Sequence, residues 1–340
     1  VGRWVEPSEA PTYQLSVPNP PIETGLASMV RQADELLLAL ALGIFPIVFY
    51  ITGYRWHLLL RALDIEMGLR KAMVINMVGA FYNTFMPGVT GGDVLKAYYA
   101  AKQTTHRTRA VMSVIIDRAI GLMALIIMGG VMSAAMYAAI GDPTNSVAQR
   151  CRQVAVGALV IVAGVSLGVV LILHPALRRG SGLSWLIKRL PAQRFFTKAF
   201  EVLTIYRRRP ALVLATLVMS FPVHAVTVSS AAMSGMALGL PVSPMYYYVA
   251  VPVIVLAGSI PISPQGAGVM EFFAIVLLSR EGATIAQAFA LTLAIRLVSV
   301  FWYLVCGVLV FRGGYHAPTA KETEDLGADE SPAAPAQNPG

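Results

Sequence analysis

The chain has 340 residues, of which 56% are hydrophobic and only 13% are charged, whereas soluble domains carry roughly 25% charged residues. This composition and a mean hydropathy of +0.65 exclude an ordinary soluble protein, because too few polar residues remain to cover a water-facing surface. The net charge of +8 does not indicate nucleic acid as a partner, because in a membrane protein a basic excess reflects topology and anionic lipid headgroups.

The apolar stretches are long enough for membrane-spanning helices and too long for barrel strands. The predicted fold class is therefore all-α, a polytopic helical membrane protein. The predicted spans are 33–60, 110–140, 154–173, 211–240 and 283–311, and two further apolar segments are 72–101 and 245–281.

Both of these further segments contain helix-breaking residues. Segment 72–101 is broken at Pro87-Gly88 and Gly91-Gly92 and has 30 residues, whereas two full spans need about 40. Its two flanks are basic, so the segment is expected to enter the membrane and return as a re-entrant hairpin. The longer segment 245–281 is broken by Pro and Gly and is either a second re-entrant hairpin or a shallow full hairpin. Its breaking residues are Pro261, Pro264, Gly266 and Gly268.

The order span, hairpin, span occurs twice, in halves 33–140 and 211–312. The predicted halves enter the membrane from opposite sides, which is the inverted-topology repeat of many secondary transporters. Asp93 precedes Arg118 by 25 residues, and Glu271 precedes Arg296 by 25 residues. We therefore expect the two hairpin tips to meet in the middle of the membrane.

Charge fixes the expected orientation. Loop 174–210 contains nine Lys or Arg residues and one acid, Glu201, so the positive-inside rule places this loop in the cytoplasm, next to anionic lipid headgroups. The C-terminus is expected on the same side, with the protein in the cell membrane.

The chain is expected to have three parts. Residues 1–30 form a polar extramembrane arm, 31–312 the transmembrane domain with its connector span 154–173, and 313–340 an acidic, Pro/Ala-rich disordered tail. The chain starts with Val and no signal peptide precedes the first span, which suggests a processed or truncated start.

Charged residues inside the spans are the strongest candidates for a site. An Arg at the centre of a span costs about 2.5–3.5 kcal/mol to insert, so Arg296 is expected to face the bundle interior with Glu271, Asp93 or Asp117 as its partner. Asp117 and Arg118 point about 100° apart on a helix, so each needs another partner.

Other candidates have structural alternatives. Asp93 and Glu271 fit the first turn of a helix capped at Thr90 or Gly268, a role compatible with substrate binding. Lys96 could instead be a snorkelling lysine beside interfacial tyrosines, and Tyr246–Tyr248 are expected in an interfacial belt. The candidate substrate-binding set is Gly91, Gly92, Asp93, Lys96, Asp117, Arg118, Gly266, Gly268, Glu271 and Arg296.

No cofactor, metal or catalytic residue is expected. The five histidines form no paired-ligand pattern. Cys151 and Cys306 are predicted on opposite sides of the membrane, so no disulfide is expected.

The ordered motifs resemble a known family. The first half contains Tyr54-Arg55-Trp56-His57, Gly91-Gly92-Asp93-Val94-Leu95-Lys96 and Asp117-Arg118-Ala119-Ile120-Gly121, and the second contains Pro264-Gln265-Gly266-Ala267-Gly268-Val269-Met270-Glu271 and Arg296-Leu297. Over residues 33–312 this set resembles the lysylphosphatidylglycerol synthase transmembrane region, or flippase-like family.

The resemblance implies a plasma-membrane protein that flips or handles a lipid. Two-part members carry a soluble aminoacyl-transfer domain, and because only a short tail follows the last span here, synthase activity is not expected and a separate lipid-modifying enzyme becomes a possible partner. A lipid translocase that holds a phospholipid or lipid-linked headgroup in a midplane cavity is the favoured function. A membrane enzyme or accessory protein of polyprenyl-linked sugar metabolism and a small-solute transporter remain alternatives.

Overall fold

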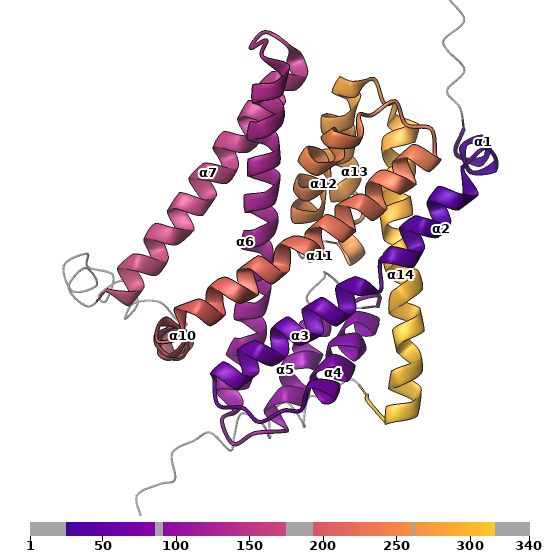
Figure 1. Ribbon diagram of the computed structural model, residues 1–340. Helices are drawn as coiled ribbons and strands as arrows, with labels where there is room; N and C mark the ends of the chain where they lie inside the picture. Colours follow the sequence, from indigo (N-terminus) through magenta and orange to yellow (C-terminus); the bar gives the residue numbers. More distant parts are fainter. Residues whose placement is uncertain (1–24, 86–90, 175–192, 261–262, 317–340) are drawn as a thin grey trace, which may run out of the picture.

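The computed structural model describes residues 25–85, 91–174, 193–260 and 263–316. Within these ranges the chain is helical and contains no strand, which confirms the predicted all-α class (Figure 1). Some predictions concern residues outside the described ranges, namely those on Pro87, Gly88, Thr90, Pro261, the arm before residue 25, much of the basic loop and the tail after residue 316.

The first half begins with two short helices in place of one long span. After α1 (Leu26–Arg31), α2 (Glu35–Ile44) ends just before Pro46 and α3 (Ile47–Ala62) begins just after it. Proline has no backbone N–H to continue the helical hydrogen bonds, so the predicted span 33–60 is divided. The half continues with α4 (Leu69–Tyr82), α5 (Gly91–Ala101) and α6 (Arg107–Ile140).

The last four α-helices have the order long, short, short, long, which the first half has with α2 and α3 in place of its first long helix. After α6, the described helices are α7 (Ser146–Leu173), α10 (Gln193–Arg207), α11 (Pro210–Ala237), α12 (Pro244–Gly258), α13 (Val269–Leu278) and α14 (Ile285–Gly313), with short 3-10 turns at Pro264–Gly266 and Ser279–Glu281. Within the described ranges, five segments are long and apolar enough to cross a membrane, namely Glu35–Ala62, Arg107–Ile140, Ser146–Leu171, Pro210–Ala237 and Ile285–Gly313. The chain is therefore a multi-pass membrane protein.

Each interrupted segment forms a pair of short helices. At 1.5 Å per residue, α4 and α5 are about 21 and 16 Å long, and α12 and α13 about 22 and 15 Å, so all four are shorter than the roughly 30 Å hydrocarbon layer. The α4–α5 and α12–α13 pairs both pack along their lengths. The second segment is thus also a hairpin of short helices.

Glycines bring the helices of each hairpin close together. A Cβ added to Gly92 would lie 1.9 Å from the Gly79 carbonyl oxygen, and one added to Gly266 would lie 2.6 Å from the Gly258 Cα. Only glycine fits such backbone contacts. The two hairpins therefore use the same packing device.

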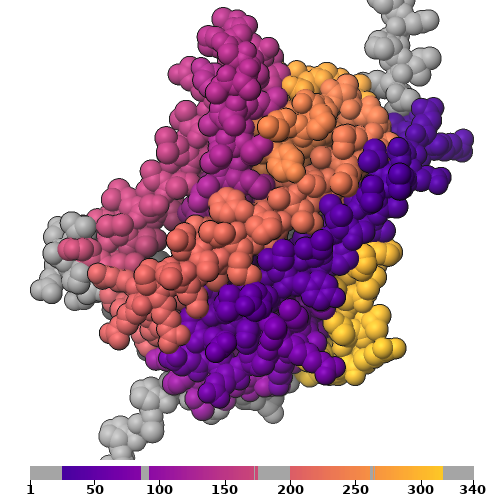
Figure 2. All heavy atoms as spheres, in the orientation of Figure 1, coloured from indigo at the N-terminus to yellow at the C-terminus, as the bar shows by residue number. Residues whose placement is uncertain are grey.

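The hairpins lie at opposite ends of the helical bundle, with α4 and α5 in the lower part of Figure 1 and α12 and α13 in the upper part. The face in view in Figure 2 is closed by α2 and α3 lying beside α11. Helix α7 packs on α6 but then diverges from it (Figure 1).

The tyrosines of α12 do not form an interfacial belt as expected. Tyr246 and Tyr247 have no exposed surface, and the Tyr246 hydroxyl donates to the Leu277 carbonyl at 3.2 Å. The Tyr247 ring lies against Gly235, which leaves space for it on α11. These rings are core residues because small residues on the facing helix make room for them.

Candidate functional site

A polar cavity of about 260 Å³ lies where the two hairpins approach each other. Its wall comes mainly from α3, α4, α5 and α6, with Val255 and Ser259 of α12 and Tyr303 of α14. Five charged side chains line this cavity, namely Arg55, Asp93, Lys96, Asp117 and Arg118. Three cations face two carboxylates, so the cavity has one positive charge in excess.

Asp117 is the centre of the buried part of this cavity. Its Oδ1 accepts from Arg55 Nε at 2.8 Å and its Oδ2 pairs with Lys96 Nζ at 3.3 Å. Arg55 also donates to the Asp117 carbonyl at 3.2 Å and to Ser220 Oγ at 2.7 Å. All three charged residues are only 5% exposed. Several charge-assisted hydrogen bonds therefore offset the cost of burying these charges.

Lys96 is held in the interior. Its ammonium lies 4.6 Å from the centre of the Trp56 ring, a cation–π contact that supplements the Asp117 pair. The Trp56 indole N–H donates in turn to Ser113 Oγ at 3.2 Å. Lys96 does not reach toward an interface, so the snorkelling interpretation is wrong.

The second ion pair of the cavity is more accessible. Arg118 Nη1 lies 2.7 Å from Asp93 Oδ2, and each side chain is 24% exposed. Asp93 stands in the first turn of α5, where the helix dipole favours a negative charge. The Gly92 amide just before it donates to Asn83 Oδ1 at 2.7 Å. Asn83 thus satisfies a backbone amide at the start of α5.

A matching ion pair lies in the second half. Arg296 Nη2 donates to Glu271 Oε1 at 2.8 Å, while Glu271 Oε2 accepts from the Gly268 amide at 2.6 Å. Thr292 Oγ1 adds a hydrogen bond to the Glu271 carboxylate at 3.2 Å. Glu271 was one of the expected partners of Arg296, so this prediction is confirmed. The bond between the Gly268 amide and the Glu271 side chain confirms the predicted cap at the start of α13. The Nε of Arg296 is buried without an acceptor.

The ten predicted residues fall into two groups. Asp93, Lys96, Asp117 and Arg118 line the polar cavity, with Gly91 and Gly92 at the start of α5 beside them. The second group, Gly266, Gly268, Glu271 and Arg296, surrounds the start of α13 and does not line the polar cavity. One cavity holding both arginines was expected, so this arrangement differs from the prediction.

The tips of the two hairpins touch. Gln265 Nε2 donates to the Asn83 carbonyl oxygen at 3.0 Å, which joins the turn before α13 to the end of α4. Gln265 has a φ of +53°, a conformation that costs energy in any residue with a side chain. The two ion pairs therefore lie on either side of one contact between the halves.

Sequence reasoning did not identify Arg55 as a site residue. In the sequence Arg55 stands in the motif Tyr54-Arg55-Trp56-His57 near the end of the first predicted span, outside the candidate set. The available signal was a charge six residues before Arg61 in an otherwise apolar helix. Its acceptor Ser220 is 165 residues away in the sequence, so no local pattern could have revealed the contact.

Other side chains play supporting roles. The His224 Nε2–H donates a hydrogen bond to the Gly121 carbonyl oxygen, 2.8 Å away. Cys151 and Cys306 are both buried and are not joined by a disulfide. Among the residues that the structure describes, no three His, Cys, Asp or Glu side chains are grouped to hold a metal ion.

Comparisons with known proteins agree with this architecture. A protein-family model described as the lysylphosphatidylglycerol synthase TM region matches residues 24–307. The chain is also 24% identical over 296 residues to a UPF0104 membrane protein of Methanothermobacter thermautotrophicus, an alignment that covers 81% of this chain and 84% of that protein. The matched region contains both hairpins and both ion pairs, so the chain belongs to the family of the lysylphosphatidylglycerol synthase transmembrane region.

Proposed function

We propose that the protein moves a lipid with a phosphate-containing headgroup across the membrane, and that the polar cavity binds the phosphate. The observation that carries this proposal is the excess of Arg55, Lys96 and Arg118 over the two carboxylates of the cavity. Membership in a lipid-related membrane protein family supports the same class of substrate.

Arg118 is the cation best placed to receive the phosphate. Its partner Asp93 is as exposed as Arg118 itself, so a phosphate can take the place of Asp93 without uncovering a deeply buried charge. The planar guanidinium matches two phosphate oxygens, which an ammonium group cannot do. In the empty state Asp93 neutralises Arg118.

Arg55 and Lys96 then have a different task. Both are fixed on Asp117 and nearly fully buried, so they supply a positive field at the base of the cavity. A preorganised field of this kind stabilises a bound anion more than mobile surface charges do. A phosphate bound by Arg118 would lie in this field while the acyl chains remain in apolar surroundings.

The proposed location is the cell membrane, with the basic side of the protein in the cytoplasm. Arg207, Arg208 and Arg209 follow one another at the end of α10 and the start of α11, and such clusters favour the cytoplasmic leaflet with its anionic headgroups. The C-terminus is proposed on the same side. A separate lipid-modifying enzyme could supply the substrate.

A headgroup-labelled phospholipid in proteoliposomes tests this function. Labelled lipid in the inner leaflet should become accessible to a membrane-impermeant quencher faster with the protein than in protein-free vesicles. An unchanged rate would contradict a translocase. Chemical change of a lipid-linked sugar would instead favour an enzyme, and uptake of a soluble metabolite without lipid movement a small-solute transporter.

A further inference from the structure

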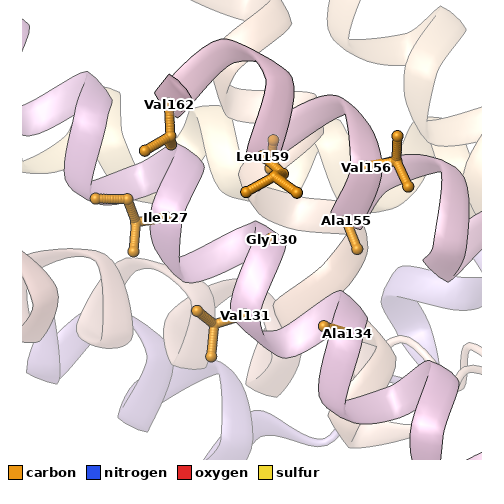
Figure 3. A pocket seen from close by; sticks show the side chains of 9 residues that line it. Ile127, Gly130, Val131, Ala134, Ala155, Val156, Leu159 and Val162 are labelled. Carbon is orange, nitrogen blue, oxygen red and sulfur yellow. The ribbon is translucent and has the colours of Figure 1, made fainter. Parts of the chain in front are cut away.

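Helices α6 and α7 are in close contact at Gly130 and Ala158, where a Cβ on Gly130 would lie 2.6 Å from the Ala158 Cβ. These two residues line two hollows, which share no other residue. The outer hollow, about 370 Å³, is lined by α6 and α7 alone, as Figure 3 shows with side chains such as Ile127, Val131 and Val156.

The inner groove, the second of these hollows, is enclosed by three helices. Its volume is about 190 Å³, and all eleven residues that line it are apolar. They are Leu125, Ile126, Gly129 and Gly130 of α6, Val154, Gly157, Ala158 and Ile161 of α7, and Pro252, Val253 and Leu256 of α12. A cavity of this size without polar groups holds no ordered water, so its natural occupant is hydrocarbon.

The residues of the inner groove follow those of the polar cavity along two helices. On α6, Arg118 and Leu122 line the cavity, and Leu125 and Gly129 line the groove. Their spacing of four, three and four residues places all of them on one face of the helix. On α12, Val255 lines the cavity and the next residue, Leu256, lines the groove. The polar and apolar sites are therefore neighbours. The outer hollow lacks residues of α12 and has no such connection.

We propose that the inner groove binds one acyl chain of the lipid whose phosphate occupies the polar cavity. This site rests on the proposed function, because the polar cavity determines which lipid enters. Only a molecule with an anionic group and a hydrocarbon chain can fill both neighbouring spaces. Gly157 helps to keep the groove open, because an added Cβ there has no atom within 4 Å and a larger side chain would fill the space.

The test uses the full chain in proteoliposomes with a phosphatidylglycerol that carries a diazirine at the end of one acyl chain. After illumination, peptide mass spectrometry locates the adducts. Adducts should be enriched several-fold on the groove residues of α6, α7 and α12 relative to Leu297, Phe301 and Leu304, which are exposed on α14 and report ordinary bilayer contact.

Two variants of α7 form a matched pair. Gly157 lines the inner groove and has no atom within 4 Å of an added Cβ, so Gly157→Trp should fill the groove and abolish the enrichment. The neighbouring Val156 lines the outer hollow only, so Val156→Trp should leave the enrichment unchanged. A diacylglycerol with the same diazirine chain lacks the phosphate and should not show the enrichment.

Three results would overturn the inference: equal labelling of the groove and of α14, equal loss with both tryptophan variants, or equal groove labelling by diacylglycerol. Photolabelling does not require lipid movement, so the proposal of an acyl-chain site and the proposal of a translocase can be rejected independently of each other. Lipid translocation without groove labelling would reject the groove alone, whereas groove labelling without translocation would support the binding site and reject the translocase.

Discussion

Arg55 and Asp117 form the most buried ion pair of the cavity. Each side chain therefore needs the other to offset the cost of burying its charge. Arg55→Ala would leave Asp117 with Lys96 as its remaining charged partner and would also remove the Ser220 contact. Breaking a buried pair costs about 3–5 kcal/mol. We expect a clear fall in the thermal unfolding temperature of the detergent-solubilised protein.

The control for this variant is Arg152→Ala, which removes an exposed arginine of α7. Changes at such surface positions are usually within about 0.5 kcal/mol. Equal unfolding temperatures for the two variants would contradict the central structural role of Arg55.

At the residue scale, charge inside an apolar helix was an informative signal but an incomplete one. The sequence predicted an interior carboxylate partner for Arg296 and left Glu271, Asp93 and Asp117 open, and the structure shows Glu271 in that place. No partner was predicted for Arg118, which pairs with Asp93. The depth of a charge was harder to infer. Lys96 and Arg55 lie close to predicted span ends in the sequence, yet packing against Trp56 and α11 buries both.

At the element scale, the glycine contacts of the hairpins lead to a direct prediction. Gly92→Ala would place a methyl group 1.9 Å from the Gly79 carbonyl oxygen, so α5 must move away from α4. Because backbone cannot yield as a flexible side chain can, we expect a loss of roughly 2 kcal/mol or more in stability. Thermal unfolding in detergent measures this loss.

Gly43→Ala is the matched comparison, since Gly43 lies within α2 and an added Cβ has no atom within 4 Å. Alanine is favoured over glycine inside a helix by roughly 0.5–1 kcal/mol, so this variant should be at least as stable as the wild type. Similar destabilisation by both substitutions would show that the Gly79–Gly92 contact is unimportant.

The helical elements themselves followed closely from hydropathy and from Pro and Gly positions. The breaks near Gly91 and Pro264 were predicted because glycines and prolines cluster there. The break at Pro46 was missed because a single proline among apolar residues has no such cluster. Pro222 and Pro252, by contrast, lie inside continuous helices, so proline alone does not determine where a membrane helix ends.

At the scale of the whole molecule, single cysteines in loops on opposite sides of the membrane test the predicted orientation. Asp142 lies in the exposed loop between α6 and α7, whereas Arg208 lies in the basic cluster beyond α10. In a background with Cys151 and Cys306 replaced by Ala, Asp142→Cys should react with an impermeant maleimide in intact cells. Arg208→Cys should react only in inverted membrane vesicles, and reaction of both cysteines from the same side would refute the orientation.

The similar order of elements in the two halves agrees with an internal repeat, while the inverted relation between the halves stays a prediction. The sequence could not indicate that the halves differ chemically. Arg118 shares a cavity with Lys96 and Asp117, whereas Arg296 is paired with Glu271 and does not line that cavity. This asymmetry depends on α3 and α11, which contribute Arg55 and Ser220 from distant parts of the chain.

The most direct test of phosphate binding in the polar cavity compares Arg118→Lys with Arg296→Lys in the lipid translocation assay at matched protein levels. Each substitution keeps the charge and removes the guanidinium fork, but only Arg118 lines the cavity. Losing one charge-assisted hydrogen bond to the phosphate costs about 1.5–3 kcal/mol, so Arg118→Lys should slow translocation by roughly tenfold or more and Arg296→Lys should have a much smaller effect. Equal effects of the two variants, or a larger effect of Arg296→Lys, would contradict the assignment of the phosphate site to the polar cavity.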